Sequence, residues 1–189
     1  MAFAIMAIAG AASVCAQDRP NYAEAALGRS TFSLDRTRFE RNALAVNSVS
    51  TSGTGYVLRV GRDMGSWWGL EAAYSDSGYM TVRGFDATAV PWRAHLHLTN
   101  WTASGVARYQ LNEGFRVFGR FGGLAYENEI GKTDSVLRIL PDQERGVGLS
   151  FGAGIVWTPL QPFSISLSAD RHGNEHKTTS YSLGVRFGF

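Results

Sequence analysis

Closely spaced histidines are the first candidates for chemistry in this sequence. His95 and His97 are separated by one residue, so on a strand both side chains would project from the same face and could share a metal ion. A third ligand with suitable spacing is lacking, and we interpret both as polar residues at the rim of a strand. His172 and His176 flank Gly173-Asn174-Glu175, which is typical of a solvated turn. The sequence therefore predicts no metal site and no cofactor.

Acidic residues form a second candidate site. Five of them fall within one long polar stretch and could bind a divalent cation: Glu127, Glu129, Asp134, Asp142 and Glu144. Because such clusters are usually solvated, we favour an exposed acidic loop.

The composition bounds the class of protein. Charged residues make up 18% of the 189 residues, below the ~25% of soluble domains, and there are 22 glycines. These values argue against a disordered chain, a coiled coil and a polytopic helical membrane protein. The net charge of +2 is too small to indicate nucleic acid, although the cations are 16 arginines and only two lysines, Lys132 and Lys177.

The first 16 residues are predicted to be a signal peptide, followed by one domain over 17–189. Residues 1–14 are apolar and uncharged, and Val14-Cys15-Ala16 leads into polar sequence, as at a cleavage site after Ala16. A buried N-terminal helix and a lipoprotein signal acylated at Cys15 remain as alternatives. Cys15 is the only cysteine, so the mature chain is neither a disulfide scaffold nor a Cys-ligated metal protein.

The rest of the chain alternates between apolar and small or polar residues with a period of two, which predicts strands. The alternation is clearest at the C-terminus and just before it. The predicted strands are roughly 22–33, 54–62, 67–76, 94–110, 114–126, 147–157, 163–170 and 180–189. Eight strands are enough to close a small barrel.

The connections alternate between short and long. Residues 63–66, 111–114 and 158–162 are predicted to be tight turns, and the polar ranges 34–53, 77–93, 127–145 and 171–178 to be longer loops. This rhythm favours an antiparallel up-and-down transmembrane β-barrel with short periplasmic turns and long extracellular loops.

The position of the charges favours a membrane over water. Charged residues within strands fall on the face opposite the apolar one: Arg59, Glu71, Arg108, Arg116, Arg120, Asp170 and Arg186. Since an arginine facing lipid at midplane costs ~2–4 kcal/mol, we expect an ion-paired filling of the lumen. Aromatic residues gather near the tight-turn ends: Trp67, Trp68, Tyr109, Phe115, Trp157, Phe163, Phe187 and Phe189. A soluble lipocalin-like barrel with an apolar ligand cavity is the alternative.

Several segments together resemble the small eight-stranded outer-membrane barrels similar to the OmpA transmembrane domain. They are Gly55–Gly61, Gly69–Tyr74, Phe118–Leu124, Gly148–Gly154 and the closing Tyr181–Phe189. The resemblance implies location in the cell outer membrane and an internal ion network that includes Glu71 and Arg120. It also implies that the C-terminus is a signal for the outer-membrane assembly machinery, carried by Tyr181, Leu183, Val185, Phe187 and Phe189. Because the sequence ends at Phe189, we expect no periplasmic peptidoglycan-binding domain.

The expected function is structural support of the membrane or a surface interaction through the loops, without a wide channel or catalytic residues. Expected partners are outer-membrane lipids, lipopolysaccharide, the assembly machinery and a surface ligand, but not nucleic acid. Arginines in or beside the loops could bind lipopolysaccharide phosphates: Arg36, Arg38, Arg41, Arg83, Arg93, Arg138 and Arg145.

Two other functions remain open. His97-Leu98-Thr99-Asn100 resembles the His-x-Ser-Asn stretch of outer-membrane lipid A deacylases, which implies an acyl hydrolase with Thr99 in place of the serine. A narrow ion pore past Arg120 and Glu71 is the other.

Overall fold

The computed structural model describes residues 20–33, 45–49, 52–85, 90–132, 143–173 and 177–189. The predicted signal peptide lies outside these residues. All regular structure in the described part is β-strand. The strands are β1 (Asn21–Phe32), β2 (Ala45–Val49), β3 (Ser52–Asp63), β4 (Trp68–Phe85), β5 (Pro91–Gln110), β6 (Phe115–Lys132), β7 (Gln143–Leu160), β8 (Phe163–Gly173) and β9 (Thr178–Gly188). Among the described residues, none forms a helix with the length and apolar character needed to cross a membrane.

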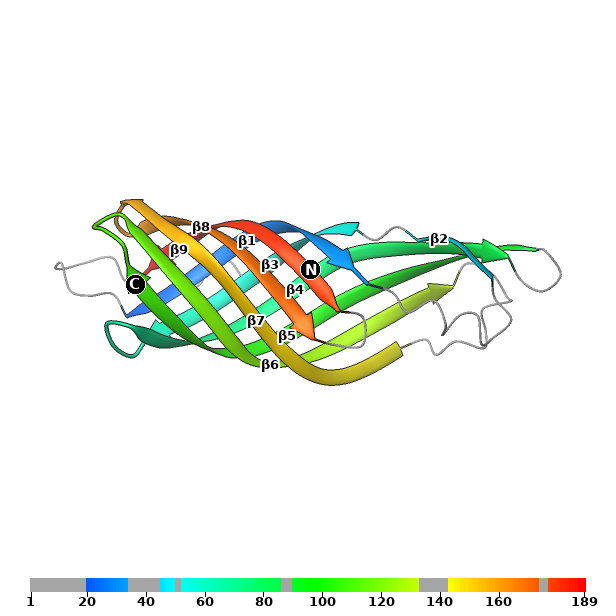
Figure 1. The fold of residues 1–189 in the computed structure, drawn as a ribbon, viewed down its shortest axis with the longest axis horizontal. Coiled ribbons are helices and arrows are strands. Elements are labelled where there is room, and N and C mark those ends of the chain that lie inside the picture. The colour runs from blue at the N-terminus through cyan, green and yellow to red at the C-terminus, as the bar shows by residue number, and fades with distance from the viewer. Residues whose placement is uncertain (1–19, 34–44, 50–51, 86–89, 133–142, 174–176) are drawn as a thin grey trace.

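Eight of these strands close into an antiparallel barrel, as predicted (Figure 1). Each strand pairs with its neighbour in the chain, and β9 returns to pair with β1. The short β2 pairs with residues 82–85 at the loop-side end of β4, beyond the residues 69–76 of β4 that pair with β3. The all-β fold class is therefore confirmed, with β2 as an addition to the barrel.

The strand register fixes the slant of the barrel. The pairings that start at Tyr22 of β1 lead strand by strand around the barrel to Thr178 of β9, whose partner on β1 is Phe32. One circuit therefore advances ten residues along β1. For eight strands this stagger corresponds to a tilt of about 40° from the barrel axis.

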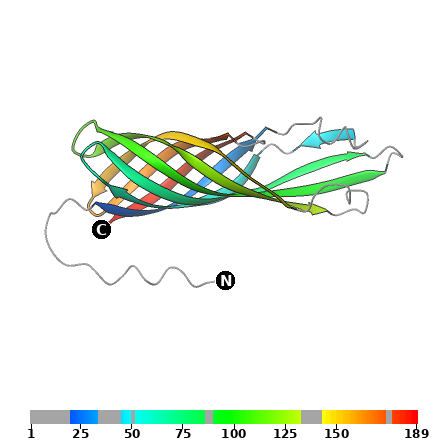
Figure 2. The same cartoon turned by 90° about the horizontal axis from the view of Figure 1, so that it is seen from below.

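The tight turns lie at the end of the barrel that also holds the C-terminus (Figures 1 and 2). In the turn between β5 and β6, the Asn112 side-chain oxygen accepts hydrogen bonds from the backbone N–H groups of Gly114 (3.0 Å) and Phe115 (2.9 Å). This Asx-type turn explains why the chain reverses here within a few residues. The backbones of Asn21 and Phe189 pair at the same end, at 2.9 and 3.2 Å. We call this the turn side and the opposite end the loop side.

The predicted loop ranges 77–93 and 127–145 are wrong over much of their length, because strands occupy them. β4 continues to Phe85, β5 begins at Pro91, β6 continues to Lys132 and β7 begins at Gln143. β2 likewise lies inside the range 34–53, and β8 reaches Gly173. The extended strands project beyond the rest of the barrel on the loop side (Figure 2). Most of the outward residues of β4 and β5 in these segments are polar, apart from Tyr79, Phe85 and Pro91, and most inward residues are apolar, so the segments resemble loops in composition although they alternate like strands.

Candidate functional site

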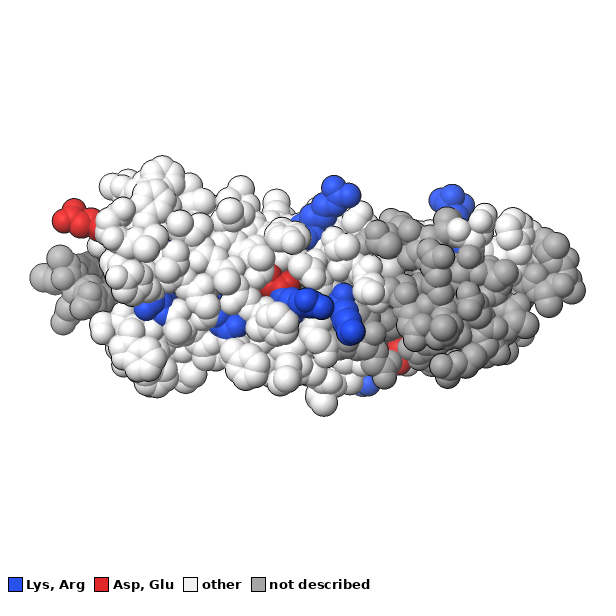
Figure 3. Space-filling model, viewed as in Figure 1, with Lys and Arg blue, Asp and Glu red and all other residues white. Residues whose placement is uncertain are grey.

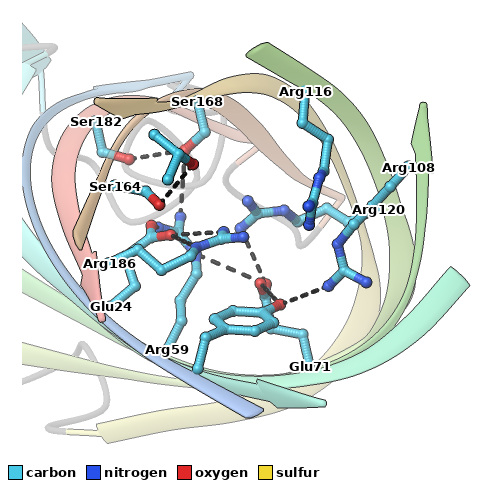
Figure 4. A network of polar contacts seen from close by, with 12 residues as sticks. Glu24, Arg59, Glu71, Arg108, Arg116, Arg120, Ser164, Ser168, Ser182 and Arg186 are labelled. Carbon is cyan, nitrogen blue, oxygen red and sulfur yellow. Dashed lines mark hydrogen bonds and ion pairs between the residues drawn. The ribbon is translucent and has the colours of Figure 1, made fainter. Parts of the chain in front are cut away.

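Six buried charged side chains meet inside the turn-side half of the barrel (Figure 4). This ionic cluster consists of Glu24, Arg59, Glu71, Arg120, Asp170 and Arg186, and each side chain is at most 9% exposed. Arg59 lies 2.5 Å from Glu24 and 2.8 Å from Asp170. Arg120 lies 3.1 Å from Glu71, and Arg186 lies 2.7 Å from the second Glu24 oxygen. Three carboxylates thus oppose three guanidinium groups, as buried charges require.

The register brings the members of the cluster together. Glu24 on β1 is directly opposite Arg59 on β3 and Arg186 on β9. On the other wall, Gly152 of β7 is opposite both Arg120 and Asp170. A Cβ atom at Gly152 would overlap a carboxylate oxygen of Asp170, so the glycine leaves room for this carboxylate in its present position.

A second charged group lies closer to the turn-side mouth. Arg108 is 2.5 Å from Asp63, and its guanidinium also donates to the Tyr22 hydroxyl at 3.1 Å. The same hydroxyl donates to Glu71 at 2.8 Å, which links the group to the ionic cluster. Arg116 is 3.6 Å from Asp63 and has a side chain 42% exposed. Of the seven charged residues expected in the lumen, six are buried there, whereas Arg116 is at the mouth.

Sequence reasoning missed Glu24 and Tyr22. The segment 21–28 has short apolar side chains on its outward face, at Ala23 and Ala25, so its alternation is weak. The available signal was the spacing of Tyr22, Glu24 and Ala26, which are two residues apart and therefore lie on one face of a strand. This spacing places the Glu24 carboxylate on the face that lines the lumen.

A layer of uncharged polar groups follows toward the loop side. Ser30 and Ser180 share a hydrogen bond of 2.8 Å, and the Asn100 amide donates to Ser75 at 3.3 Å. His172, predicted in a loop, is instead on β8 with its side chain buried, 3.1 Å from the Ser150 hydroxyl. The reason is that β8 keeps its alternation through residue 172. His176 lies outside the described residues.

Apolar side chains fill the lumen beyond this layer. This apolar plug consists of Phe32, Met80, Val82, Trp92, Ala94, Leu96, Leu98, Leu124 and Tyr126. All of them are 7% exposed or less. The space left beside Phe32, Leu96 and Leu98 is about 10 Å³, at the lower limit for one water molecule. The interior therefore changes from ionic to apolar along the barrel axis.

The outer wall of the barrel changes from apolar on the turn side to mostly polar on the loop side. On the turn side its outward residues are apolar and exposed, for example Leu27 (71%), Leu183 (60%) and Val185 (57%). The predicted turn-side aromatic residues are at this end of the strands, and a second set, Tyr56, Tyr74, Trp101 and Tyr181, faces outward toward the loop side. From Tyr109 to Trp101, β5 rises about 20 Å along the axis at a tilt of about 40°. In Figure 3 the surface on the turn side is mostly white, whereas charged groups gather near mid-length.

A polar rim begins where the apolar wall ends. On β4 and β5, Asp76 lies 2.9 Å from Nε2 of His97. On β6 and β7, Glu127 lies 2.8 Å from Arg145. The predicted acidic residues Glu127, Glu129 and Glu144 are thus on strands and not in a loop, while Asp134 and Asp142 lie outside the described residues.

The rim histidines and Thr99 contact groups on the neighbouring strands. Nε2 of His97 contacts Asp76, whereas its Nδ1 is 4.0 Å from Glu129, beyond hydrogen-bond distance. The Thr99 hydroxyl contacts the Glu127 backbone oxygen at 3.5 Å. His95 contacts Thr81 at 3.2 Å. Within the described ranges, no group of three or more His, Cys, Asp or Glu residues could hold a metal ion.

Three of the arginines proposed to bind phosphate are on strands. Arg83 and Arg93 are directly opposite each other on β4 and β5 with exposed side chains, and Arg145 is on β7. The others, Arg36, Arg38, Arg41 and Arg138, lie outside the described residues.

Comparisons with known proteins agree with this architecture. No curated protein sequence matches the chain. OprG from Pseudomonas aeruginosa is similar in structure with a TM-score of 0.58 and 10% identity, covering 90% of this chain and 97% of that one. Ail, the attachment invasion locus protein of Yersinia pestis, matches with a TM-score of 0.57 and 17% identity over 90% and 99% of the two chains. The N-terminal β-barrel domain of P. aeruginosa OprF matches with a TM-score of 0.56 and 16% identity over 92% and 100%.

These identities are low enough that the structural matches show the fold alone, but a family model covers the whole sequence. The model for the outer membrane protein beta-barrel domain matches residues 1–189. The predicted location in the outer membrane and the predicted kinship with small OmpA-like barrels are thereby confirmed. The apolar wall, the ion-paired interior and this match together lead to one conclusion: the chain belongs to the outer membrane protein β-barrel domain family.

Proposed function

We propose that this protein is a sealed outer-membrane barrel that presents its extended strands at the cell surface and does not conduct solutes. The observation that carries the proposal is the pair of successive fillings in the lumen, the ionic cluster and the apolar plug. A solute that passed the ionic cluster would still be blocked by the apolar plug.

The ionic cluster supports a structural role. Its carboxylates and guanidinium groups are matched in number and join β1, β3, β4, β6, β8 and β9 across the interior. Removal of one partner from a buried pair typically costs 3–5 kcal/mol, so such a network resists opening.

The apolar plug supports closure on the loop side. Ions and polar solutes would have to lose their hydration among side chains such as Leu96, Leu98 and Trp92, which is unfavourable without compensating hydrogen bonds. An ion pore past Arg120 and Glu71 is disfavoured for the same reason.

A surface role is supported by the polar outer wall of the extended strands. β4, β5, β6 and β7 carry exposed polar residues well beyond the aromatic residues that mark the loop-side end of the apolar wall. A rigid barrel that positions such a surface is suited to contact other molecules at the cell exterior. The protein is accordingly proposed to be non-enzymatic, and Thr99→Ala is expected to leave lipid A acylation unchanged.

Two predictions about export and assembly also remain proposals. We infer that residues 1–16 are removed, which the mass of the purified protein would test. The outward row Tyr181, Leu183 and Val185, with Phe187 and Phe189, is proposed as the signal for the assembly machinery. Deletion of Phe189 should reduce the heat-modifiable form in the outer membrane.

Conductance and surface labelling test the proposed function. Purified protein in planar bilayers should give no stable conductance steps, and steady single-channel steps would overturn the sealed lumen. For presentation, Tyr79→Cys in a Cys15→Ser background should react with a membrane-impermeant maleimide on intact cells. The matched control Glu113→Cys, at an exposed position in the turn between β5 and β6 at the other end, should react only after lysis. Labelling of Glu113→Cys on intact cells would contradict the proposed orientation.

A further inference from the structure

The rim of the outer wall is not electrically uniform. The first charged outward residue on β4 is Asp76, and it is paired with His97 on β5. On β6 it is Glu127, paired with Arg145 on β7. On these four strands, Asp76 and Glu127 therefore each have a basic partner.

The other side of the barrel has cations in the same place. On β1 the outward row Ala23, Ala25 and Leu27 ends at Arg29, and on β8 the row Ile165, Leu167 and Ala169 ends at Arg171. β9 separates these strands and supplies outward Tyr181, which is directly opposite Arg29 and Ala169. Both arginines are exposed. They therefore lie on the lipid-facing wall at the level where the apolar surface ends.

These two arginines lack the partners found elsewhere on the rim. In the part of the chain that the structure describes, no carboxylate forms an ion pair with Arg29 or Arg171. One Arg29 nitrogen donates to the Ser52 hydroxyl at 3.0 Å, which orients the side chain but does not neutralise it. Lys177, just before β9, is exposed as well and adds to the positive charge.

We propose that Arg29 and Arg171 form a binding site for the phosphate groups of a phosphorylated lipid headgroup in the outer leaflet. A guanidinium matches phosphate geometry with two parallel hydrogen bonds, and cations at a membrane interface attract anionic headgroups. Two strand spacings and an offset of two residues separate Arg29 from Arg171, so their Cα atoms are about 12 Å apart and can be bridged by a headgroup with two phosphates. A lipid-borne phosphate is favoured over a soluble anion because the site adjoins the apolar wall, where acyl chains pack.

The site rests on the membrane placement in the proposed function, but it has its own test. Protein in detergent micelles is mixed with diphosphoryl lipid A or with monophosphoryl lipid A, and bound lipid is counted by native mass spectrometry. Wild-type protein should bind the diphosphoryl form at least tenfold more tightly. The variant Arg29→Gln/Arg171→Gln should lose at least tenfold in affinity, and Arg29→Lys/Arg171→Lys should retain part of it.

The matched control is Arg145→Gln: the sequence also made Arg145 a candidate phosphate ligand, but its ion pair with Glu127 neutralises it, so this variant should change affinity less than twofold. Heat-modifiability on a gel confirms that each variant is folded, and each single variant replaces the double one if that fails to fold. Equal affinity of wild type and the double variant would overturn the proposal, as would equal binding of both lipid A forms. Displacement of lipid A by inositol hexakisphosphate would assign the site to soluble anions and equally overturn it. None of these outcomes affects the conductance and labelling results, so the two proposals fail separately.

Discussion

The two halves of the barrel are built with opposite polarity. In the turn-side half, Arg59 and Glu24 are buried in the interior while Leu27 and Leu183 are exposed on the wall. In the loop-side half, Leu96 and Val82 are buried in the interior while His97 and Glu129 are on the wall. β5 and β6 run through both halves without a break in their pairing, whereas β4 has a β-bulge against β5 between Asp76 and Tyr79, beyond which its even-numbered residues face inward.

This contrast shows that the medium around each half decides which residues face inward. Lipid requires an apolar wall, which leaves the lumen for charges that satisfy one another. Water around the extended strands accepts polar side chains, and the apolar residues then collect inside as in a soluble domain. On β5 the outward residues change from apolar to polar between Trp101 and Thr99, and we infer that this pair marks the loop-side boundary of the membrane.

The largest expected effect is the loss of a carboxylate from the ionic cluster. Glu24→Ala leaves Arg59 and Arg186 without their closest partner and should lower the free energy of unfolding by about 3–5 kcal/mol. Urea unfolding in phospholipid vesicles measures this. The double variant Glu24→Gln/Arg186→Gln should recover part of the loss, because both charges are removed. A loss below about 1 kcal/mol for Glu24→Ala would show that the cluster contributes little.

The next largest effect distinguishes the lipid-facing outer wall from the outer wall of the extended strands. Leu183→Arg places a charge on the lipid-facing wall between Leu27 and Leu167 and should cost about 2–4 kcal/mol of unfolding free energy in the same vesicles. Thr99→Arg places the same charge above the boundary and should change it by no more than about 0.5 kcal/mol. Equal costs at the two sites would remove the distinction between the halves.

A smaller effect is expected from the apolar plug. Val82 is fully buried there, and Val82→Ala removes two methyl groups and should cost about 2 kcal/mol. Because the plug lies outside the membrane, the cost should be the same in detergent micelles as in vesicles. A cost that depends on the lipid would place Val82 inside the bilayer.

The smallest effect is expected at the exposed pair on the rim. Arg145 is 71% exposed and pairs with Glu127, and an ion pair in that setting contributes about 0–1 kcal/mol. Arg145→Gln should therefore barely shift the urea midpoint, and any shift should shrink in 0.5 M salt. A loss of 3 kcal/mol or more would mean that the pair is shielded from water.

The barrel itself was predictable from the sequence because its lipid-facing strands alternate strongly. Tyr181, Leu183 and Val185 have a clear period of two against serine and glycine, and the structure places them outward on β9. The turn at Asn112 was also predictable, since its side chain supplies the local hydrogen bonds. Strand number, order and direction followed from these local signals.

The loop-side half was not predictable in the same way. In β4 the inward residues Met80 and Val82 alternate with outward Thr81 and Arg83, and these polar residues gave the predicted loop range 77–93 the composition of a loop. Glu24 was missed because Ala23 and Ala25 give a weak contrast. The proposed rim site was missed because Arg171 fell in the predicted loop 171–178, whereas the structure places it on the outward face of β8, two strands from Arg29.

Spin-label accessibility along β5 tests the reversal of polarity most directly. Single cysteines in a Cys15→Ser background at outward positions Ala107, Gly105, Ala103, Thr99, His97 and His95 would carry nitroxides in lipid bilayers. Labels at 103, 105 and 107 should be relaxed mainly by oxygen, and labels at 95, 97 and 99 mainly by a water-soluble nickel complex. Oxygen-dominated relaxation that continues to residue 95, or nickel-dominated relaxation at residues 103–107, would contradict a membrane boundary between Trp101 and Thr99.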